Sequence, residues 1–188
     1  SVLVALLCET DFVARNEDFV NLSEALSKKA LEEGVENMKT GAKEMIDPVI
    51  QKTGENITLG EVLEIEGATI GSYVHNNKSA VIVSLVGGNT ELAKDVAMHI
   101  AAMKPEYIQM SDIDEEAKKM MTEVYQKEVA SVDKPEEIKK KMLEGKIATY
   151  FKEKTLLSQP FIKNPDETIE KLLEKNKATV KEVRKYSI

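Results

Sequence analysis

The chain has 188 residues, of which 42% are hydrophobic and only 5% aromatic, so it can bury a core built mainly on aliphatic side chains and methionine. Its 33 acidic and 26 basic residues give a formal net charge of −7, which argues against direct nucleic-acid binding because phosphate contacts need a basic face. No apolar run approaches the ~18 residues that a transmembrane helix needs, and we expect a cytoplasmic protein with no membrane partner.

An apolar run over residues 2–7 predicts a buried strand, and Cys8 directly follows it. Because Cys8 is the single cysteine, an internal disulfide and a multi-thiolate metal site are excluded, and its apolar setting predicts a buried, unreactive thiol. Apolar residues at helical spacing predict a helix over residues 17–33. Between these two elements, residues 10–16 predict an ordered turn that carries Phe12.

A second helix is predicted over residues 42–52, with Asp47-Pro48 either kinking it or marking its start. The pattern then changes to that of strands over residues 57–65 and 69–75. The polar cluster at 76–79 predicts a hairpin turn into a further, fully apolar strand over residues 80–86.

The segment Gly87-Gly88-Asn89-Thr90 ends that strand and predicts the start of a helix over residues 90–103. His99 falls near the apolar stripe of this helix, which predicts a half-buried histidine. The stripe is formed by Leu92, Val96, Ile100 and Met103. The order strand, polar loop and amphipathic helix thus occurs twice in the chain, which suggests two related subdomains.

Charged side chains dominate residues 112–154, with eleven acidic and ten basic residues. Helical spacing, a capping pattern of Ser111 with Asp114, and a break before Pro135 predict two helices with a short turn. Such a pair forms an antiparallel helical hairpin, and its charge density predicts that it protrudes into solvent.

After the hairpin, residues 159–161 are predicted to be extended and residues 166–175 to form a short helix. A strand over residues 178–188 should then rejoin the sheet of the second subdomain. The predicted fold class is α+β: two related subdomains with small antiparallel sheets covered by helices, plus the hairpin. The predicted boundaries are 1–68 for the first subdomain, 69–110 with 155–188 for the second, and 111–154 for the hairpin.

Five segments of the chain carry a family resemblance: TDFVARN at 10–16, GENI at 54–57, GSYVH at 71–75, MHIAA at 98–102 and SQPF at 158–161. In this order they resemble elongation factor Ts, the nucleotide-exchange partner of the translational GTPase elongation factor Tu. The resemblance covers essentially the whole chain. Members of this family begin with a small helical domain that has no counterpart before Ser1, so we interpret the chain as a fragment.

This resemblance implies guanine-nucleotide exchange on elongation factor Tu, with Asp11 and Phe12 wedged near the Mg²⁺ and phosphate site of the GTPase. It implies that Thr10 and Val13 hold the turn. Gly54, on the first subdomain, is a candidate for a secondary contact, although Thr53 stands where the family commonly carries an apolar residue.

His75 is a further candidate contact, from the second subdomain; the alternative is a structural role at the end of its strand. A wedge must be accessible, so we predict that Phe12 is exposed in the free protein. The alternative is that Phe12 packs into the local core while Asn16 caps the following helix.

Nothing in the sequence predicts covalent chemistry. It contains no phosphate-binding glycine loop, no nucleophile elbow and no metal-ligand spacing, so we expect no catalytic residues, no metal and no cofactor. Ser72 and His75 could be written as part of a triad, but residue types alone do not establish one. The competing function is a noncatalytic scaffold that acts through the charged hairpin, and a homodimer formed through the hairpin also stays open.

Overall fold

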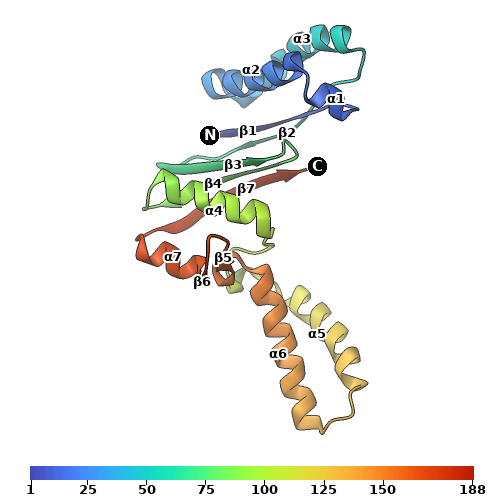
Figure 1. The fold of residues 1–188 in the computed structure, drawn as a ribbon, viewed down its shortest axis with the longest axis vertical. Coiled ribbons are helices and arrows are strands. Elements are labelled where there is room, and N and C mark those ends of the chain that lie inside the picture. Colours follow the sequence, from blue (N-terminus) through green and yellow to red (C-terminus); the bar gives the residue numbers. More distant parts are fainter. The chain divides into compact units, whose positions relative to one another are not determined.

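The computed structural model describes residues Ser1–Ile188, and its contacts divide them into two compact units. The first unit consists of Ser1–Ala101 with Lys181–Ile188, and the second of Ala102–Val180. Helices and small sheets follow one another along the chain (Figure 1), so the predicted α+β class is confirmed. Both larger sheets belong to the first unit, whereas the sequence predicts a boundary at residue 68. The finer three-part division stays a prediction.

The first unit opens with the predicted strand β1 (Val2–Leu7), which pairs antiparallel with β2 (Thr58–Glu64). Between them lie α1 (Asp11–Ala14), α2 (Glu17–Glu33) and α3 (Val35–Thr53). The prediction for α2 is confirmed, but α3 begins seven residues before the predicted start. Pro48 therefore lies inside a helix that continues through it.

The core of this part is aliphatic, as the composition predicts. Side chains spaced three or four residues apart on α2 and α3 face β1 and β2, because that spacing brings them to one side of each helix. The buried members are Val13, Phe19, Leu22, Leu26, Ala30, Met38, Ala42, Ile46, Val49 and Ile57. The turn at residues 10–16, called the signature turn below, is anchored in this core through Val13 alone.

The second sheet of the first unit has the strand order β3 (Thr69–His75), β4 (Ser79–Val86), β7 (Thr179–Ser187). The predicted hairpin turn and the predicted return of the last strand are both confirmed. Asn76 and Asn77 adopt left-handed conformations, with φ of 52° and 55°, in the turn between β3 and β4.

Helix α4 (Thr90–Met103) follows β4 and is capped by Asn89, whose side-chain oxygen accepts from the backbone N–H of Leu92 at 2.9 Å. Two details of its predicted stripe are wrong. His99 is fully buried, not half-buried, and Met103 is 46% exposed. Met103 is the last residue of the helix.

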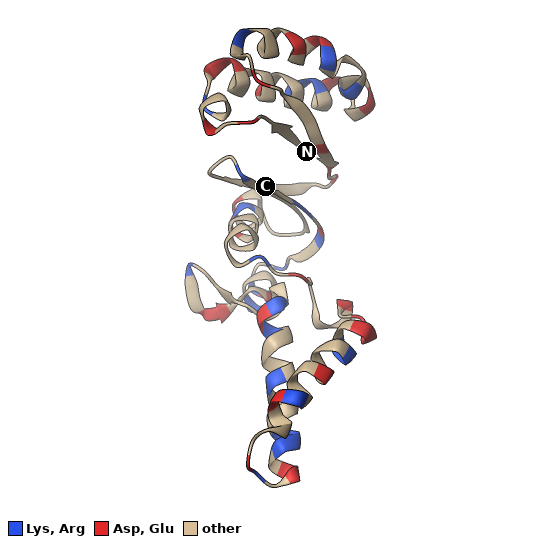
Figure 2. Cartoon of the chain, turned by 90° about the vertical axis from the view of Figure 1, so that its right-hand side faces the viewer, with Lys and Arg blue, Asp and Glu red and all other residues tan.

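The second unit contains the predicted hairpin, made of α5 (Glu115–Ala130) and α6 (Glu136–Lys154). Asp114 itself caps α5 by accepting from the N–H of Ala117 at 2.6 Å, which corrects the predicted cap at Ser111. Ser111 lies instead in a short 3-10 turn, Met110–Asp112. Acidic and basic residues are interspersed along both helices (Figure 2), which agrees with the high charge density of this segment.

In the rest of the second unit, the structure differs from the predicted secondary structure in one place. The segment after Phe161 forms a small antiparallel sheet, β5 (Pro160–Phe161) with β6 (Asn164–Thr168), before α7 (Ile169–Lys175). The helix therefore starts three residues later than predicted. Thr168 caps α7 by accepting from the N–H of Lys171, which places its predecessors in the extended strand.

Replacing residues 116–149 by a short Gly/Ser loop should leave the first unit folded. The hairpin buries little of itself: Val129 is the one buried residue of α5, and Phe151, which the replacement spares, is the one buried residue of α6. We expect cooperative thermal unfolding with a melting temperature within about 4 °C of the parent, the change that ~1 kcal/mol produces in a domain of this size. Loss of cooperative melting would show that the hairpin supports the sheets.

Candidate functional site

The signature turn contains the short helix α1 and leads into α2, and each of the two helices has a side-chain cap at its N-terminus. Thr10 caps α1, because its hydroxyl oxygen accepts from the backbone N–H of Val13 at 3.3 Å. Asn16 caps α2, because its side-chain oxygen accepts from the N–H of Asp18 at 2.8 Å. The N–H of Asn16 in turn donates to the carbonyl of Val13 at 2.9 Å. Residues 10–16 are therefore an ordered, hydrogen-bonded segment, as predicted.

Phe12 and Val13 point to opposite environments. Phe12 is 89% exposed, whereas Val13 is 7% exposed and belongs to the core. The prediction that Phe12 is exposed is confirmed, and the alternative that it packs into the local core is wrong. The capping role of Asn16, which belonged to that alternative, is nevertheless correct. A large aromatic side chain that is held in water by an ordered helix is typical of a contact residue.

Gly54 ends α3 in a left-handed conformation, with φ of 73°, and its N–H donates to the carbonyl of Ile50 at 2.8 Å. This geometry explains a glycine at the position. The following residue, Glu55, binds Thr10: its carboxylate accepts from the N–H of Thr10 at 3.1 Å and from its hydroxyl at 2.6 Å. The structure thus brings the Gly54 segment to the signature turn. Sequence reasoning missed Glu55, although it stands in one of the five family-like segments.

The turn between β3 and β4 also contacts the signature turn. The ammonium group of Lys78 lies 3.2 Å from the Asp11 carboxylate. His75, which directly precedes that turn, is exposed; its ring contacts the hydroxyl of Tyr73 at 3.3 Å and the amide of Asn76 at 3.2 Å. Asp11, Lys78 and His75 therefore belong to one polar neighbourhood of the first unit.

Ser72 does not share a face with His75. Side chains alternate along a strand, so Tyr73 and His75 lie on one face of β3 and Ser72 on the other. The Ser72–His75 pair is thereby ruled out as a hydrolytic centre.

Cys8 is half-buried, not buried as predicted. Burial, followed by the nearby charge of Glu55, raises the pKa of its thiol, and the Asp11 charge adds to this. A raised pKa lowers the thiolate fraction, so the expectation of an unreactive thiol is supported by this pKa direction.

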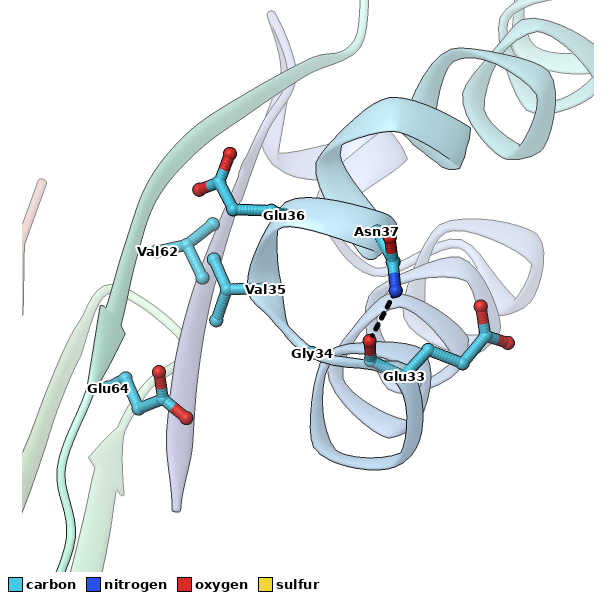
Figure 3. A pocket seen from close by; sticks show the side chains of 7 residues that line it. All are labelled: Glu33, Gly34, Val35, Glu36, Asn37, Val62 and Glu64. Atoms are coloured by element: carbon cyan, nitrogen blue, oxygen red, sulfur yellow. Dashed lines mark hydrogen bonds between the residues drawn. The ribbon is translucent and has the colours of Figure 1, made fainter.

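A shallow acidic cleft of about 420 Å³ lies between the α2–α3 connection and β2 (Figure 3). Glu33, Glu36 and Glu64 line it with Val35 and Val62. No group of His, Cys, Asp and Glu side chains in the chain has the arrangement of a metal site. No helix is both long and apolar enough to cross a bilayer.

Taken together, the exposed aromatic residue and its ordered support form the kind of arrangement that is typical of a protein-contact site. The family model described as "Elongation factor TS" matches residues 9–188. The Elongation factor Ts of Hahella chejuensis is 38% identical over 194 residues, which cover 100% of this chain and 68% of that protein. That of Marinobacter nauticus is 38% identical over 170 residues, 88% of this chain and 59% of that protein.

The Elongation factor Ts of Teredinibacter turnerae is 37% identical over 195 residues, 100% of this chain and 67% of that protein. The chain therefore belongs to the elongation factor Ts family. It spans about two thirds of the length of these relatives.

Val13→Ala should lower the free energy of unfolding by about 1–2 kcal/mol, because it removes two buried methyl groups from the core under α1. Denaturant melts measure this. Val20→Ala is the matched control, since Val20 is 36% exposed on the neighbouring α2 and should change stability by less. Equal losses in the two variants would contradict the anchoring role of Val13.

Proposed function

We propose that this chain promotes GDP release from elongation factor Tu. The observation that carries the proposal is the exposure of Phe12 on the capped helix α1, within a chain of the elongation factor Ts family. Phe12 is the apolar intruder and Asp11 its polar companion near the Mg²⁺ and phosphate site of the GTPase. Thr10 and Val13 hold the helix, while Gly54 and His75 contribute flanking contacts.

Such a function requires binding and no bond-making. The chain must bind the nucleotide-free GTPase more tightly than the GDP·Mg²⁺ form, because only a differential affinity shifts an equilibrium. By linkage, the chain weakens nucleotide binding by the same factor by which nucleotide weakens binding of the chain. An exposed wedge suits this task because its contacts form only when the nucleotide site opens.

The proposal is tested with elongation factor Tu loaded with fluorescent GDP. Addition of the chain with excess unlabelled GDP should accelerate the loss of fluorescence, and the rate should saturate as the chain concentration rises. A release rate that does not change with the chain, at concentrations where the chain binds the GTPase, would reject exchange activity.

The competing function is a scaffold that works through the hairpin. The observation that favours it is a pair of exposed apolar residues one turn apart on α5, Met120 at 60% and Val124 at 50%. The variant with residues 116–149 replaced distinguishes the two functions. Full exchange activity in that variant supports the wedge, whereas loss of partner capture with α1 intact supports the scaffold.

A further inference from the structure

We propose that Glu55 is a positioning residue for the partner-binding helix: its carboxylate clamps Thr10 and thereby fixes the direction in which Phe12 is presented. This inference deepens the proposed function and rests on it. Glu55 lies 45 residues from Thr10 in the chain and is not one of the residues that carry the wedge.

The clamp has two hydrogen bonds to one residue. One carboxylate oxygen accepts from the Thr10 hydroxyl at 2.6 Å, and the other accepts from the Thr10 N–H at 3.1 Å. The same hydroxyl oxygen accepts from the N–H of Val13 at 3.3 Å. The Thr10 hydroxyl therefore donates a hydrogen bond to Glu55 and at the same time accepts one from the first turn of α1. Hydrogen bonds to a charged acceptor are stronger than neutral ones.

Glu55 is itself held from both sides. It follows Gly54, whose N–H closes the last turn of α3, and its own N–H lies 3.5 Å from the Thr53 hydroxyl, which donates to the carbonyl of Val49 at 2.8 Å. Two residues further on, Ile57 is buried in the core. Glu55 thus directly follows the end of the long helix α3, so its position is fixed by that helix. Through its hydrogen bonds to Thr10, it restrains the four residues of α1 in turn.

The requirement for a carboxylate follows from the chemistry of Thr10. Both groups that Thr10 offers to Glu55 are donors, so the clamp needs two acceptors side by side. A glutamine can accept from the Thr10 N–H through its amide oxygen, but it faces the hydroxyl with an NH₂ group, so the hydroxyl must turn from donor to acceptor. Glu55→Gln therefore replaces the charged double acceptor by a neutral group with almost no change in shape.

The clamp acts on binding because Phe12 is too exposed to be held by its own contacts. Any freedom of α1 in the free chain must be lost when Phe12 enters the partner, and this loss weakens binding. A pre-ordered helix avoids that cost. Glu55 can thus influence exchange without touching the GTPase.

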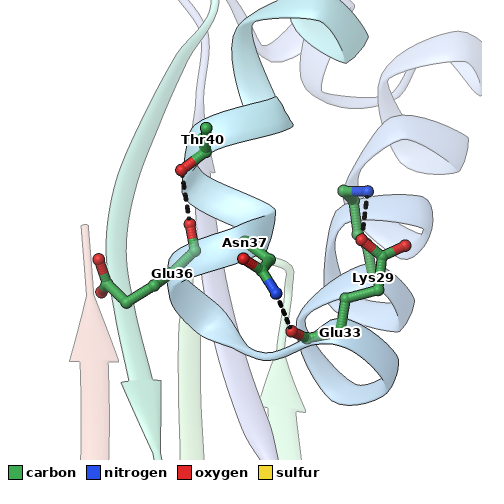
Figure 4. A network of polar contacts seen from close by, with 5 residues as sticks. All are labelled: Lys29, Glu33, Glu36, Asn37 and Thr40. Carbon is green, nitrogen blue, oxygen red and sulfur yellow. Dashed lines mark hydrogen bonds and ion pairs between the residues drawn. The ribbon is translucent and has the colours of Figure 1, made fainter.

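The test compares Glu55→Gln with a matched control, Glu33→Gln. Glu33 lies at the end of α2, where its carboxylate pairs with Lys29 at 2.7 Å and its carbonyl accepts from Asn37 (Figure 4), away from the signature turn. In the free protein, the NMR signal of the Thr10 amide proton should move upfield in Glu55→Gln, because its bond to the carboxylate weakens. It should stay in place in Glu33→Gln.

For GDP release from elongation factor Tu, Glu55→Gln should lower kcat/KM about tenfold, which corresponds to about 1.4 kcal/mol. Thr10→Val removes the hydroxyl that donates to Glu55 and that also caps α1, so its loss should be at least as large. The double variant should be no worse than Thr10→Val alone, because both changes break one unit. Thr10→Ser keeps the hydroxyl and the N–H and should retain activity, as should Glu33→Gln.

Three results would overturn the inference: an unmoved Thr10 signal, unchanged exchange in Glu55→Gln, or multiplicative losses in the double variant. A loss of exchange that only follows the unfolded fraction in a melt would also overturn it, since Glu55 would then be merely structural. If the parent chain releases no GDP, the proposed function fails and the role of Glu55 in exchange falls with it. The Thr10 signal would still reveal the clamp in the free protein, so the two failures are distinguishable.

Discussion

Phe12→Ala is expected to reduce exchange about thirtyfold, because aromatic hot-spot residues cost ~2 kcal/mol or more when truncated. The free energy of unfolding should change by no more than about 0.5 kcal/mol, as for other surface substitutions. The two effects separate because Phe12 is 89% exposed in the free chain and makes its contacts only in a complex. GDP-release kinetics and denaturant melts on the same variant measure both quantities.

Two further truncations serve as controls for Phe12→Ala. Phe19→Ala removes the same atoms from a side chain that is 7% exposed, so it should cost about 3–5 kcal/mol of stability. Leu31→Ala truncates another exposed apolar residue, 62% exposed at the far end of α2, and should leave both stability and exchange near the parent values. If Phe12→Ala lost exchange only in proportion to lost stability, the motif would be structural.

Local signals predicted most elements of the first unit. The period of apolar residues located β1 and α2, and the polar cluster at 76–79 located the β3–β4 turn, because hydrophobic spacing and turn chemistry act over a few residues. The same reasoning failed for α3. Its first turns, before residue 42, were missed because Gly41 indicates a helix break, whereas packing of Met38 and Ala42 against the core sustains the helix.

The site could be predicted only in part. The residues Thr10 to Val13 lie together in the chain, so a motif and its neighbours were enough to predict an ordered turn with Phe12 exposed. The contacts of Glu55 with Thr10 and of Lys78 with Asp11 join residues that are far apart in sequence. Pairing of that kind depends on how β2 and β4 fold back, which no local pattern specifies.

These distant contacts share one consequence for the site. Thr10 is held by Glu55, Val13 by the core and Asp11 by Lys78, whereas Phe12 alone among the four is left free for a partner. The exposed ion pair contributes little by itself, because both side chains are hydrated and screened. The core contact of Val13 is therefore the support that matters most for the presentation of Phe12, and the two hydrogen bonds of Glu55 to Thr10 add to it.

A large loss of stability is also expected at a glycine. Gly71 lies on β3, where α4 crosses the strand so closely that a Cβ atom would overlap the backbone of Ala93 and Lys94 and lie 2.8 Å from the Ala93 methyl group. Backbone cannot rotate away as a side chain can, so Gly71→Ala must push α4 off the sheet. We expect a loss of about 3 kcal/mol or more in the free energy of unfolding, at the upper end of overpacking effects.

Gly41→Ala is the matched control for Gly71→Ala, because it adds the same atom in the same unit. There the nearest atom is the Lys29 Cε at 3.2 Å, the mobile end of a long side chain, and the site is the interior of α3. The Lys29 side chain can move aside at little cost, and alanine stabilises a helix interior more than glycine does. We therefore expect the free energy of unfolding to rise by about 0.5–1 kcal/mol. The denaturant concentration at the midpoint of unfolding should therefore fall for Gly71→Ala and rise for Gly41→Ala. A small effect at Gly71 would mean that α4 can shift on the sheet, and a disturbance of His75, four residues along the same strand, should then appear in its NMR signals.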